Sequence, residues 1–536
     1  MGIVRFSCLA AALLLIACAG PKQKPRVENP DGRKITGHPD SAWQTVSPAT
    51  GAHNRTSPDG GPPFPDARDT LPWDLPPADA RSGMPGRDSS VRGVDSSDLP
   101  PPYGSRPVPA GPGPGAGKQT AAPAYSRPDG IIPRPRPPGL PEKIRVLLSQ
   151  GTKPVILYSL GDVQILTEEP AADSQGVKRV SVARLATLKG RFEIRRTAGG
   201  FAVVAAGKTA RSTSSRRLRI IPVNPYNLID VGGAVYRGGL HIIGDGGKSR
   251  EGDGGIMVVN VLGIEDYLRG VLPYEMGTLD RTGLEALKAQ AIVARTYAFK
   301  RMMKGGNRNF HVYSSVQDQV YKGVRGEYLL SDRAVWETRG MAVSHADTLA
   351  VCYYHSTCSG RTASKHEVWG GDSIPYLVSR SDTDGIGDAF CRASKLSSWK
   401  EEWGLSQLAG ILKRNLRSAG VADFPAFNTV KSVSAPERAS CGRIRTLRIE
   451  TDKGPILVKG DKVRWALRPP ATQEKILPSA FFDLKNSGGK LTVQGKAFGH
   501  GVGLCQYGAM ARARDGQNFR EIIEAYYRDV RIAEFK

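Results

Sequence analysis

A long stretch that is poor in aliphatic residues constrains this 536-residue chain more than any other feature. From residue 19 to about residue 142 the sequence is dominated by Pro, Gly, Ser, Asp and Arg, as in PDGGPPFPDARDTLPWDLPP. Such a segment buries too little apolar surface to offset the entropy that is lost on ordering. We therefore predict a disordered, Pro/Gly-rich linker over residues 19–142 and folded structure from about Lys143.

The first 18 residues predict export. Arg5 is followed by an apolar run that is too short to span a bilayer stably. The run ends in LIAC, which is typical of the lipobox of bacterial lipoproteins, so we expect residues 1–18 to be a lipoprotein signal peptide with a lipidated Cys18. A plain signal peptide that is cleaved near Ala17 or Ala19 is the alternative. In a two-membrane bacterium the anchor is compatible with an outer membrane, with the protein facing the periplasm.

The formal net charge of +24 bears on the partners rather than on the reaction. A cytoplasmic chain of this charge would suggest nucleic acid. An exported chain meets cell-wall glycans, peptide carboxylates and lipid head groups instead, so we expect the basic excess to favour retention in the cell envelope and predict no nucleic-acid partner.

Two kinds of hydrophobic pattern follow the linker. Residues 143–227 alternate apolar and polar residues between Gly-containing turns, as in KPVILYSL and RFEIRRTAGGFAVVAAG, and predict a β-rich module. Residues 228–536 mix further strands with helical stretches, among them GLEALKAQAIVARTYAFKRMM, where Leu284, Leu287, Ala291, Ala294 and Ala298 share one face. No regular βαβ repeat appears, so the α+β class is favoured.

The segment VLPYEMG holds the carboxylate of greatest interest, Glu275. It lies in a turn-like stretch before the long helix, and a solvated loop residue is the ordinary interpretation. Thr282 and Glu285 fit a capping box, which would give Glu285 a structural role at the helix N-terminus. Glu265 has a basic neighbour, Arg269, with which it could pair.

Cysteines and histidines offer further chemistry without a decisive motif. After Cys8 and Cys18, five cysteines remain, and in an oxidising compartment a Cys358–Cys391 disulfide is favoured. A zinc site that includes Cys352, His355 and Cys358 is the alternative, although the paired spacing of common zinc sites is missing. The pairing of Cys352, Cys441 and Cys505 stays open. No G-x-S-x-G elbow supports a Ser-His nucleophile, and GDGGKSREGDGG lacks the helix that a phosphate-binding loop requires.

Seven ordered blocks between about Val258 and Ile532 resemble the family of stage II sporulation protein D, also called the SpoIID/LytB or amidase-enhancer family. They are VVNVLGIEDYLRGVLPYEMG, LEALKAQAIVARTYAF, DQVYKGV, YYHSTCSGRTASKHEVWGG with PYLVSR, GRIRTLRIE, GHGVGLCQYGAMARA and AYYRDV. The resemblance implies a β-rich N-terminal module at residues 143–227 and a mixed α/β SpoIID-like catalytic domain at residues 228–536.

The resemblance also implies an activity. It is that of a lytic transglycosylase, which cleaves denuded peptidoglycan strands to 1,6-anhydromuramyl ends with a single acid/base, the glutamate of the P-x-E-M block, here Glu275. The family motifs further place residues for substrate binding and site support at Lys288, Gln290, Arg295, Gln319, Tyr321, His355, Ser359, His500, Gln506 and Tyr507.

The resemblance leaves two matters open. Some members hold zinc with His and Cys near the DQVY block, but FHVYSSVQDQVY retains only His311, so we carry over no metal and expect no cofactor. Other members enhance a cell-wall amidase without evident catalysis. A non-catalytic, peptidoglycan-binding amidase enhancer is therefore the alternative function, and sporulation need not be the process served.

Overall fold

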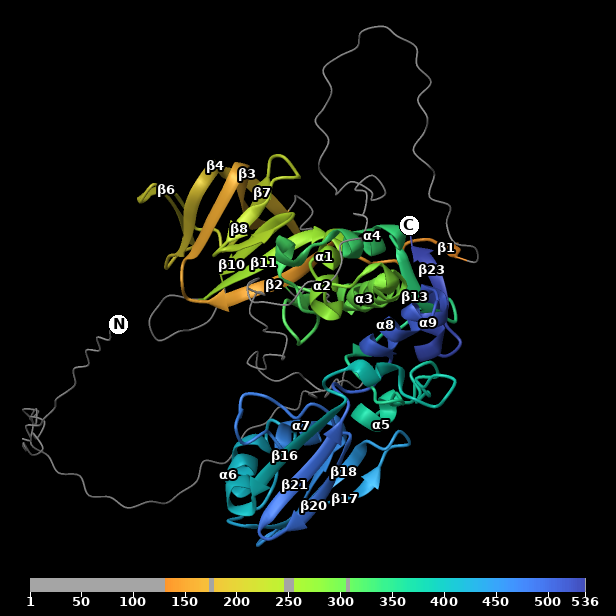
Figure 1. Cartoon of the computed structure of the whole chain (residues 1–536). Helices are drawn as coiled ribbons and strands as arrows, with labels where there is room; N and C mark the ends of the chain where they lie inside the picture. Colours follow the sequence, from red (N-terminus) through yellow and green to blue (C-terminus); the bar gives the residue numbers. More distant parts are fainter. Residues whose placement is uncertain (1–130, 173–177, 245–254, 305–308, 536) are drawn as a thin grey trace, which may run out of the picture. The chain divides into compact units, whose positions relative to one another are not determined.

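The computed structural model describes residues 131–172, 178–244, 255–304 and 309–535. These residues combine helices with sheets, so the predicted α+β class is confirmed (Figure 1). The predictions for residues 1–18 and for most of residues 19–142 fall outside the described part and stay predictions. Within that part, no helix has the length and apolar character needed to cross a membrane.

The largest sheet among the described residues has eleven strands and continues past residue 227, where we expected a module to end. Strand β10 pairs antiparallel with β7, and β11 pairs antiparallel with β2, so strands from both sides of residue 227 share one sheet (Figure 1). The main path is β12-β2-β11-β10-β7-β3-β4-β5-β6, with β8 and β9 attached at β3. The strands are β2 (Lys143–Gly151), β3 (Val155–Ala172), β4 (Lys178–Arg196), β5 (Phe201–Ala205), β6 (Lys208–Thr213), β7 (Arg217–Pro222), β8 (Ile229–Val231), β9 (Ala234–Tyr236), β10 (Gly239–Gly244), β11 (Ile256–Gly263) and β12 (Val312–Tyr313).

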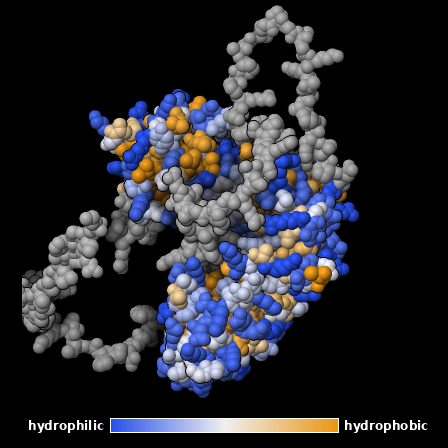
Figure 2. Space-filling model, in the orientation of Figure 1, coloured by the Kyte–Doolittle hydropathy of each residue, from blue (hydrophilic) through white to orange (hydrophobic). Residues whose placement is uncertain are grey.

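Period-two alternation explains how β3 is placed in this sheet. Val155 and Leu157 point into a hydrophobic core, whereas Ile156 and Tyr158 between them are exposed. Alternate residues of this strand thus lie on a buried and an exposed face, and the exposed face is also partly apolar. Figure 2 shows hydrophobic side chains gathered over the part of the molecule that carries β3, β4 and β7.

Helix α3 forms the centre of a second core. Its predicted face is buried at Leu287, Ala291, Ala294 and Ala298 but only partly buried at Leu284, and Ala289, Ile292 and Val293 outside that face are buried as well. A helix that is buried almost all round is packed on several sides, which is why a single stripe described it incompletely. The surrounding helices are α1 (Ile264–Arg269), α2 (Leu272–Met276), α3 itself (Leu284–Lys304) and α4 (Leu329–Glu337).

The capping box expected at Thr282 and Glu285 is wrong. A short 3-10 turn, η2 (Arg281–Gly283), precedes α3, and the Asp280 side chain accepts the hydrogen bond from the Thr282 N–H. Asp280 thus does the capping two residues earlier than predicted. Glu285 instead accepts a hydrogen bond from the Phe519 N–H at 2.9 Å and pairs with Lys288 at 2.7 Å, so its role is still structural.

A separate core lies between residues 398 and 496, within the stretch that we expected to be one domain. Trp403, Leu412, Leu447 and Val493 are completely buried in it. Two three-stranded sheets, β16-β21-β20 and β17-β18-β19, supply most of its walls. Its elements are β16 (Ser398–Gly404), α6 (Leu405–Asn415), β17 (Val430–Arg438), β18 (Ile444–Thr451), β19 (Gly454–Lys459), η5 (Gly460–Lys462), α7 (Val463–Ala466), β20 (Phe482–Ser487) and β21 (Lys490–Lys496).

The chain then returns to the core around α3. Strand β22 pairs in parallel with β15, and β23 joins β1, β13 and β14 in a four-stranded sheet. Strand β1 falls inside the range predicted as linker, so order begins before Lys143, because β23 from the far end of the chain supplies hydrogen-bonding partners. The remaining elements are β1 (Ile132–Arg134), η3 (Gly323–Gly326), β13 (Met341–His345), β14 (Thr348–Leu349), β15 (Tyr354–His355), α5 (Lys365–Trp369), η4 (Phe390–Ala393), β22 (Leu504–Cys505), α8 (Gln506–Arg514), α9 (Phe519–Tyr526) and β23 (Arg531–Phe535).

Candidate functional site

Glu275 lies on the five-residue helix α2, not in an open turn. Pro273 falls in its first turn, where a missing N–H costs nothing, and Gly277 ends it with a φ of 70°. Leu272 and Met276 are buried and fix the helix against the core. The helix therefore holds Glu275 in one position, in which the residue as a whole is half-buried and its carboxyl group is shielded from solvent.

Three groups from distant segments converge on the Glu275 carboxylate. The Val320 N–H donates to Oε1 at 3.1 Å, and Gln506 Nε2 donates to Oε2 at 3.3 Å. The Tyr354 hydroxyl forms a third hydrogen bond with the same carboxylate. Of the predicted site residues, Gln506 thus contacts Glu275 directly, from the first position of α8.

Burial dominates the electrostatics of this carboxyl group. Desolvation raises the pKa of Glu275 to about 7, although the hydrogen bonds from Val320, Gln506 and Tyr354 lower it in part. A carboxyl group with this pKa is present in both protonation states near neutral pH. It can therefore donate a proton and take one back, as general acid–base chemistry requires.

A chain of hydrogen bonds positions Tyr354. Gln319 Nε2 donates to the Tyr354 hydroxyl at 3.1 Å, and Gln319 Oε1 accepts from the Tyr267 hydroxyl at 3.1 Å. Gln319 is completely buried and also donates to the Ala294 carbonyl on α3. The predicted residue Gln319 therefore acts on Glu275 through Tyr354.

The DQV segment is itself anchored to α3. Asp318 accepts hydrogen bonds from the Tyr297 hydroxyl and from the Tyr313 N–H, and it pairs with Arg301 at 2.9 Å. This anchoring fixes the backbone that presents the Val320 N–H to Glu275.

His355 and His500 lie beside each other, with ring centroids 5.6 Å apart. His500 accepts from the Val502 N–H and packs against the Trp369 ring at 4.9 Å. Burial lowers the pKa of His355 to about 3 and that of His500 well below its usual range, so both rings are neutral. His500 also hydrogen-bonds the backbone of Tyr354, which links this pair to the Glu275 site.

Three predicted substrate-binding residues have structural partners instead. Lys288 pairs with Glu285 and Glu337, both at 2.7 Å. Arg295 is completely buried and pairs with Glu265, the residue for which the sequence offered Arg269 as a possible partner.

Arg269 instead pairs with Glu327 and Asp332. Tyr321 is the third predicted substrate-binding residue with a structural partner. It is buried, and its hydroxyl donates to Asn260 Oδ1 at 2.8 Å. Within the described part of the chain, these three side chains are engaged with these partners and not with the Glu275 carboxylate.

The other predicted residues are less directly placed. Gln290 is completely buried on α3, and within the described residues neither polar atom of its amide has a hydrogen-bonding partner. The Tyr507 N–H donates to the Ser356 carbonyl, and its ring packs on the core around α3.

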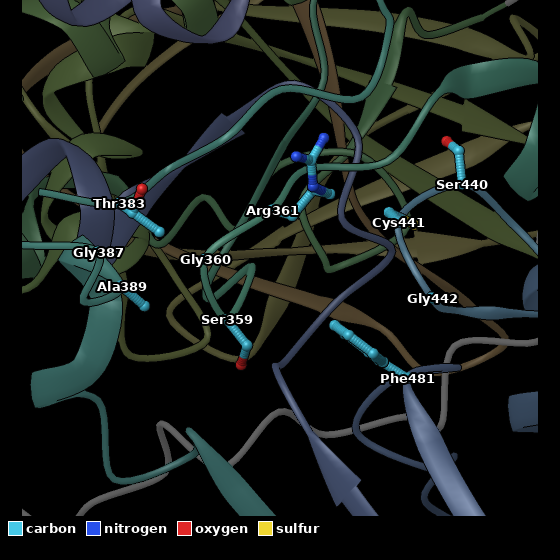
Figure 3. A pocket seen from close by; sticks show the side chains of 10 residues that line it. All are labelled: Ser359, Gly360, Arg361, Thr383, Gly387, Ala389, Ser440, Cys441, Gly442 and Phe481. Carbon is cyan, nitrogen blue, oxygen red and sulfur yellow. The ribbon is translucent and has the colours of Figure 1, made fainter.

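Ser359 lines a cavity of about 460 Å³. Figure 3 shows Ser359, Thr383 and Ala389 on one side of this cavity and Ser440 and Phe481 on the other. Among the described residues, Glu275 is not part of the lining.

Neither arrangement expected for the cysteines is formed as such. Cys358 and Cys391 are neighbours, with sulfurs 3.6 Å apart, but both are free thiols in this structure, and their disulfide stays a prediction. Among the described residues, Cys352 and His355 belong to no group of three or more ligand atoms that could hold a metal ion.

Sequence reasoning missed Tyr354, Asp318 and the Val320 N–H. Tyr354 directly precedes His355 in a segment that we had singled out, but its hydroxyl carried no motif of its own. A backbone donor such as the Val320 N–H leaves no signal in the sequence at all.

Two family models match parts of the chain. The sequence matches the family described as stage II sporulation protein over residues 252–345 and a domain of unknown function (DUF8618) over residues 388–503. The first match contains Glu275, α3 and part of the core around that helix. The second contains the whole of the separate core at residues 398–496.

Relatives extend the likeness over half of the chain. Stage II sporulation protein D of Bacillus amyloliquefaciens is 30% identical over 291 residues, which are 51% of this chain and 74% of that protein. An uncharacterized protein of Brachyspira hyodysenteriae is 30% identical over 282 residues, 52% of this chain and 69% of that protein. The amidase enhancer of Bacillus subtilis is 29% identical over 290 residues, 48% of this chain but only 39% of its own length. The chain belongs to the stage II sporulation protein D family.

Proposed function

We propose that the protein is a peptidoglycan lytic transglycosylase and that Glu275 is its acid/base. The observation that carries the proposal is the burial of this carboxyl group, with its pKa raised to about 7, inside a set of three oriented donors. A solvated loop glutamate would need neither the burial nor the donors. Perturbed carboxyl groups of this kind are typical of catalytic sites.

One carboxyl group suffices for this reaction. Protonated Glu275 donates its proton to the glycosidic oxygen as the bond to the muramyl C1 breaks. The C6 hydroxyl of the same muramyl residue attacks C1, and the Glu275 carboxylate takes the hydroxyl proton. Hydrolytic glycosidases need a second carboxyl group to activate water or to act as the nucleophile. Here the substrate supplies the nucleophile, and the residue regains its proton.

Tyr354 and Gln506 keep the carboxylate in place between these two steps. Both donate to Glu275 and come from segments that pair through β15 and β22. Their hydrogen bonds stabilise the carboxylate form, which offsets part of the burial and keeps the pKa near neutrality.

The second candidate function is that of a peptidoglycan-binding enhancer of a cell-wall amidase. It is favoured by the relative named amidase enhancer. In either case we propose that the protein is exported and held at a membrane surface by a lipid on Cys18, with glycan strands as its partner. A cell-wall amidase is a further partner under the second candidate.

The two candidates are separated by the products. Purified protein incubated with denuded glycan strands should release 1,6-anhydromuramyl ends, and Glu275→Gln should lower the rate by about a thousandfold or more, because the variant has no proton to donate. Glu285→Gln is the control, since Glu285 faces Lys288 and Phe519 rather than the site. If the wild type binds glycan or stimulates an amidase but releases no anhydro ends, the enhancer is correct and the enzyme is not.

A further inference from the structure

Four buried side chains outside the Glu275 site bring their ligand atoms together. The sulfurs of Cys358, Cys391 and Cys505 and a carboxylate oxygen of Asp382 all lie within 4.8 Å of one another. Cys391 lies in η4 and Cys505 in β22. Asp382 and Cys391 are close in sequence and flank the bridge between Thr383 and Ala389, whereas Cys358 and Cys505 come from distant segments that only the tertiary fold brings to them.

The spacing fits a tetrahedral ion. Zinc–sulfur bonds of about 2.3 Å at tetrahedral angles separate two sulfurs by roughly 3.8 Å. The sulfurs of Cys358 and Cys391 lie 3.6 Å apart, and the Cys358 sulfur is 3.1 Å from Asp382 Oδ2. Three thiols and one carboxylate suit zinc, because soft sulfur ligands select it over magnesium or calcium.

The carboxylate ligand is oriented from outside the cluster. Arg512 Nε and the Tyr526 hydroxyl both donate to Asp382 Oδ1, at 3.1 Å and 3.0 Å. Oδ2 is thereby left to face the sulfurs. Such outer partners are typical of protein metal sites, where they fix the direction of the ligands.

Backbone donors stabilise the thiolates. The Ser359 N–H donates to the Cys391 sulfur at 3.2 Å, and the Gly508 N–H donates to the Cys505 sulfur at 3.4 Å. Cys505 is also the N-cap of α8, where the helix dipole favours negative charge.

We propose that Cys358, Asp382, Cys391 and Cys505 form a structural zinc site. All four residues lie outside the segment FHVYSSVQDQVY, where other family members hold zinc and this sequence lacks the cysteine. All four positions are occupied by protein side chains, so the ion has no open position for water and acts by cross-linking the fold.

The site would hold the two strands that serve Glu275. Cys505 pairs with His355 in the parallel bridge, and their neighbours Gln506 and Tyr354 are the side chains that contact the Glu275 carboxylate. By binding Cys505, zinc would fix the bridge next to the two side chains that contact Glu275. The metal-binding claim does not rest on the proposed activity.

A Cys358–Cys391 disulfide is the competing arrangement. It would leave the Cys505 thiol and Asp382 Oδ2 buried and turned toward the bonded sulfurs, without a ligand of their own. Zinc instead uses all four groups, which is why we favour it.

The test measures metal in the full chain, purified without chelator and passed through a desalting column. Elemental analysis should give one zinc per chain, and cobalt exchanged into the site should show the thiolate-to-cobalt charge-transfer absorption of a tetrahedral site. Cys505→Ser and Asp382→Asn should each lower zinc retention by about tenfold or more. Cys352→Ser, which removes another buried free thiol outside the cluster, should retain the full amount.

The wild-type measurement does not depend on how the variants fold. Wild-type chain without stoichiometric zinc, together with a Cys358–Cys391 cystine peptide in a non-reducing digest, would overturn the proposal. Full zinc retention by Cys505→Ser and Asp382→Asn would overturn it equally. Loss of glycan cleavage in a zinc-loaded wild type would count against the proposed function alone.

Discussion

At the scale of single residues, Glu275 is held between two opposing effects. Desolvation favours its neutral form, whereas Val320, Gln506 and Tyr354 favour the carboxylate. Desolvation is the larger effect and the three donors offset part of it, so the pKa is raised to about 7 and no further. The donors on the carboxylate therefore tune its acidity as well as fix its direction.

The raised pKa makes the stability of the protein depend on pH. The pKa of Glu275 rises from 4.5 to about 7 on folding. The contribution of this group to the free energy of unfolding is therefore fully present below pH 4.5 and is lost as the pH rises through 7. Glu275→Gln does not titrate. Between pH 4 and pH 8 its free energy of unfolding should therefore gain about 3 kcal/mol relative to wild type.

Urea denaturation at several pH values measures this difference. Glu524→Gln, at an exposed position of α9, serves as the control. The difference in free energy of unfolding between this variant and wild type should change much less with pH. A difference between Glu275→Gln and wild type that stays constant from pH 4 to pH 8 would mean that the Glu275 carboxyl group is not desolvated.

At the scale of elements, Arg295 joins α3 to α1. It pairs with Glu265 and donates to the Met341 carbonyl at 3.0 Å, although no part of its side chain is exposed. A fully buried guanidinium group cannot meet a polymeric substrate without rearrangement of the core. Arg295 was predicted to bind substrate or support the site. Its partners instead give it a role in holding α3 against the neighbouring elements.

Arg295→Ala should lower the free energy of unfolding by about 3 kcal/mol, because Glu265 would be left without its partner. The double variant Glu265→Gln, Arg295→Met should recover part of this loss, since no unpaired charge remains. Thermal and urea denaturation measure both values. Unchanged stability with a raised KM for glycan strands would instead assign Arg295 to substrate binding.

At the scale of the whole molecule, the large sheet determines which part of the chain can fold alone. Strands β2 and β7 lie before residue 227, and they pair with β11 and β10 after it. Ile144 and Val146 of β2 also contribute to the core around α3. A cut at residue 227 would expose both strand edges and open that core.

A fragment of residues 228–536 should therefore be insoluble or melt without cooperativity, whereas a fragment of residues 131–536 should melt cooperatively. The second fragment keeps β1 and β2 with all their partners. Solubility and circular dichroism on heating make the comparison. Equal, cooperative melting of the two fragments would show that the region after residue 227 is an independent domain.

The sequence by itself determined the α+β class, the long α3 helix and the choice of Glu275 as the first residue to test. These follow from periodicity and from ordered motifs, which are properties of neighbouring residues. The cap of α3 was misplaced because Asp280 and Thr282 both satisfy the local preference, and only the 3-10 turn selects between them.

Only the tertiary structure decided what surrounds Glu275 and where the cysteines meet. Tyr354 and Gln506 reach Glu275 through a parallel bridge between strands about 150 residues apart. Cys358, Asp382, Cys391 and Cys505 converge for the same reason. Long-range pairing depends on the packing of complete elements, and sequence spacing does not encode it. Burial, which sets the acidity of Glu275, likewise exists only once the chain has folded.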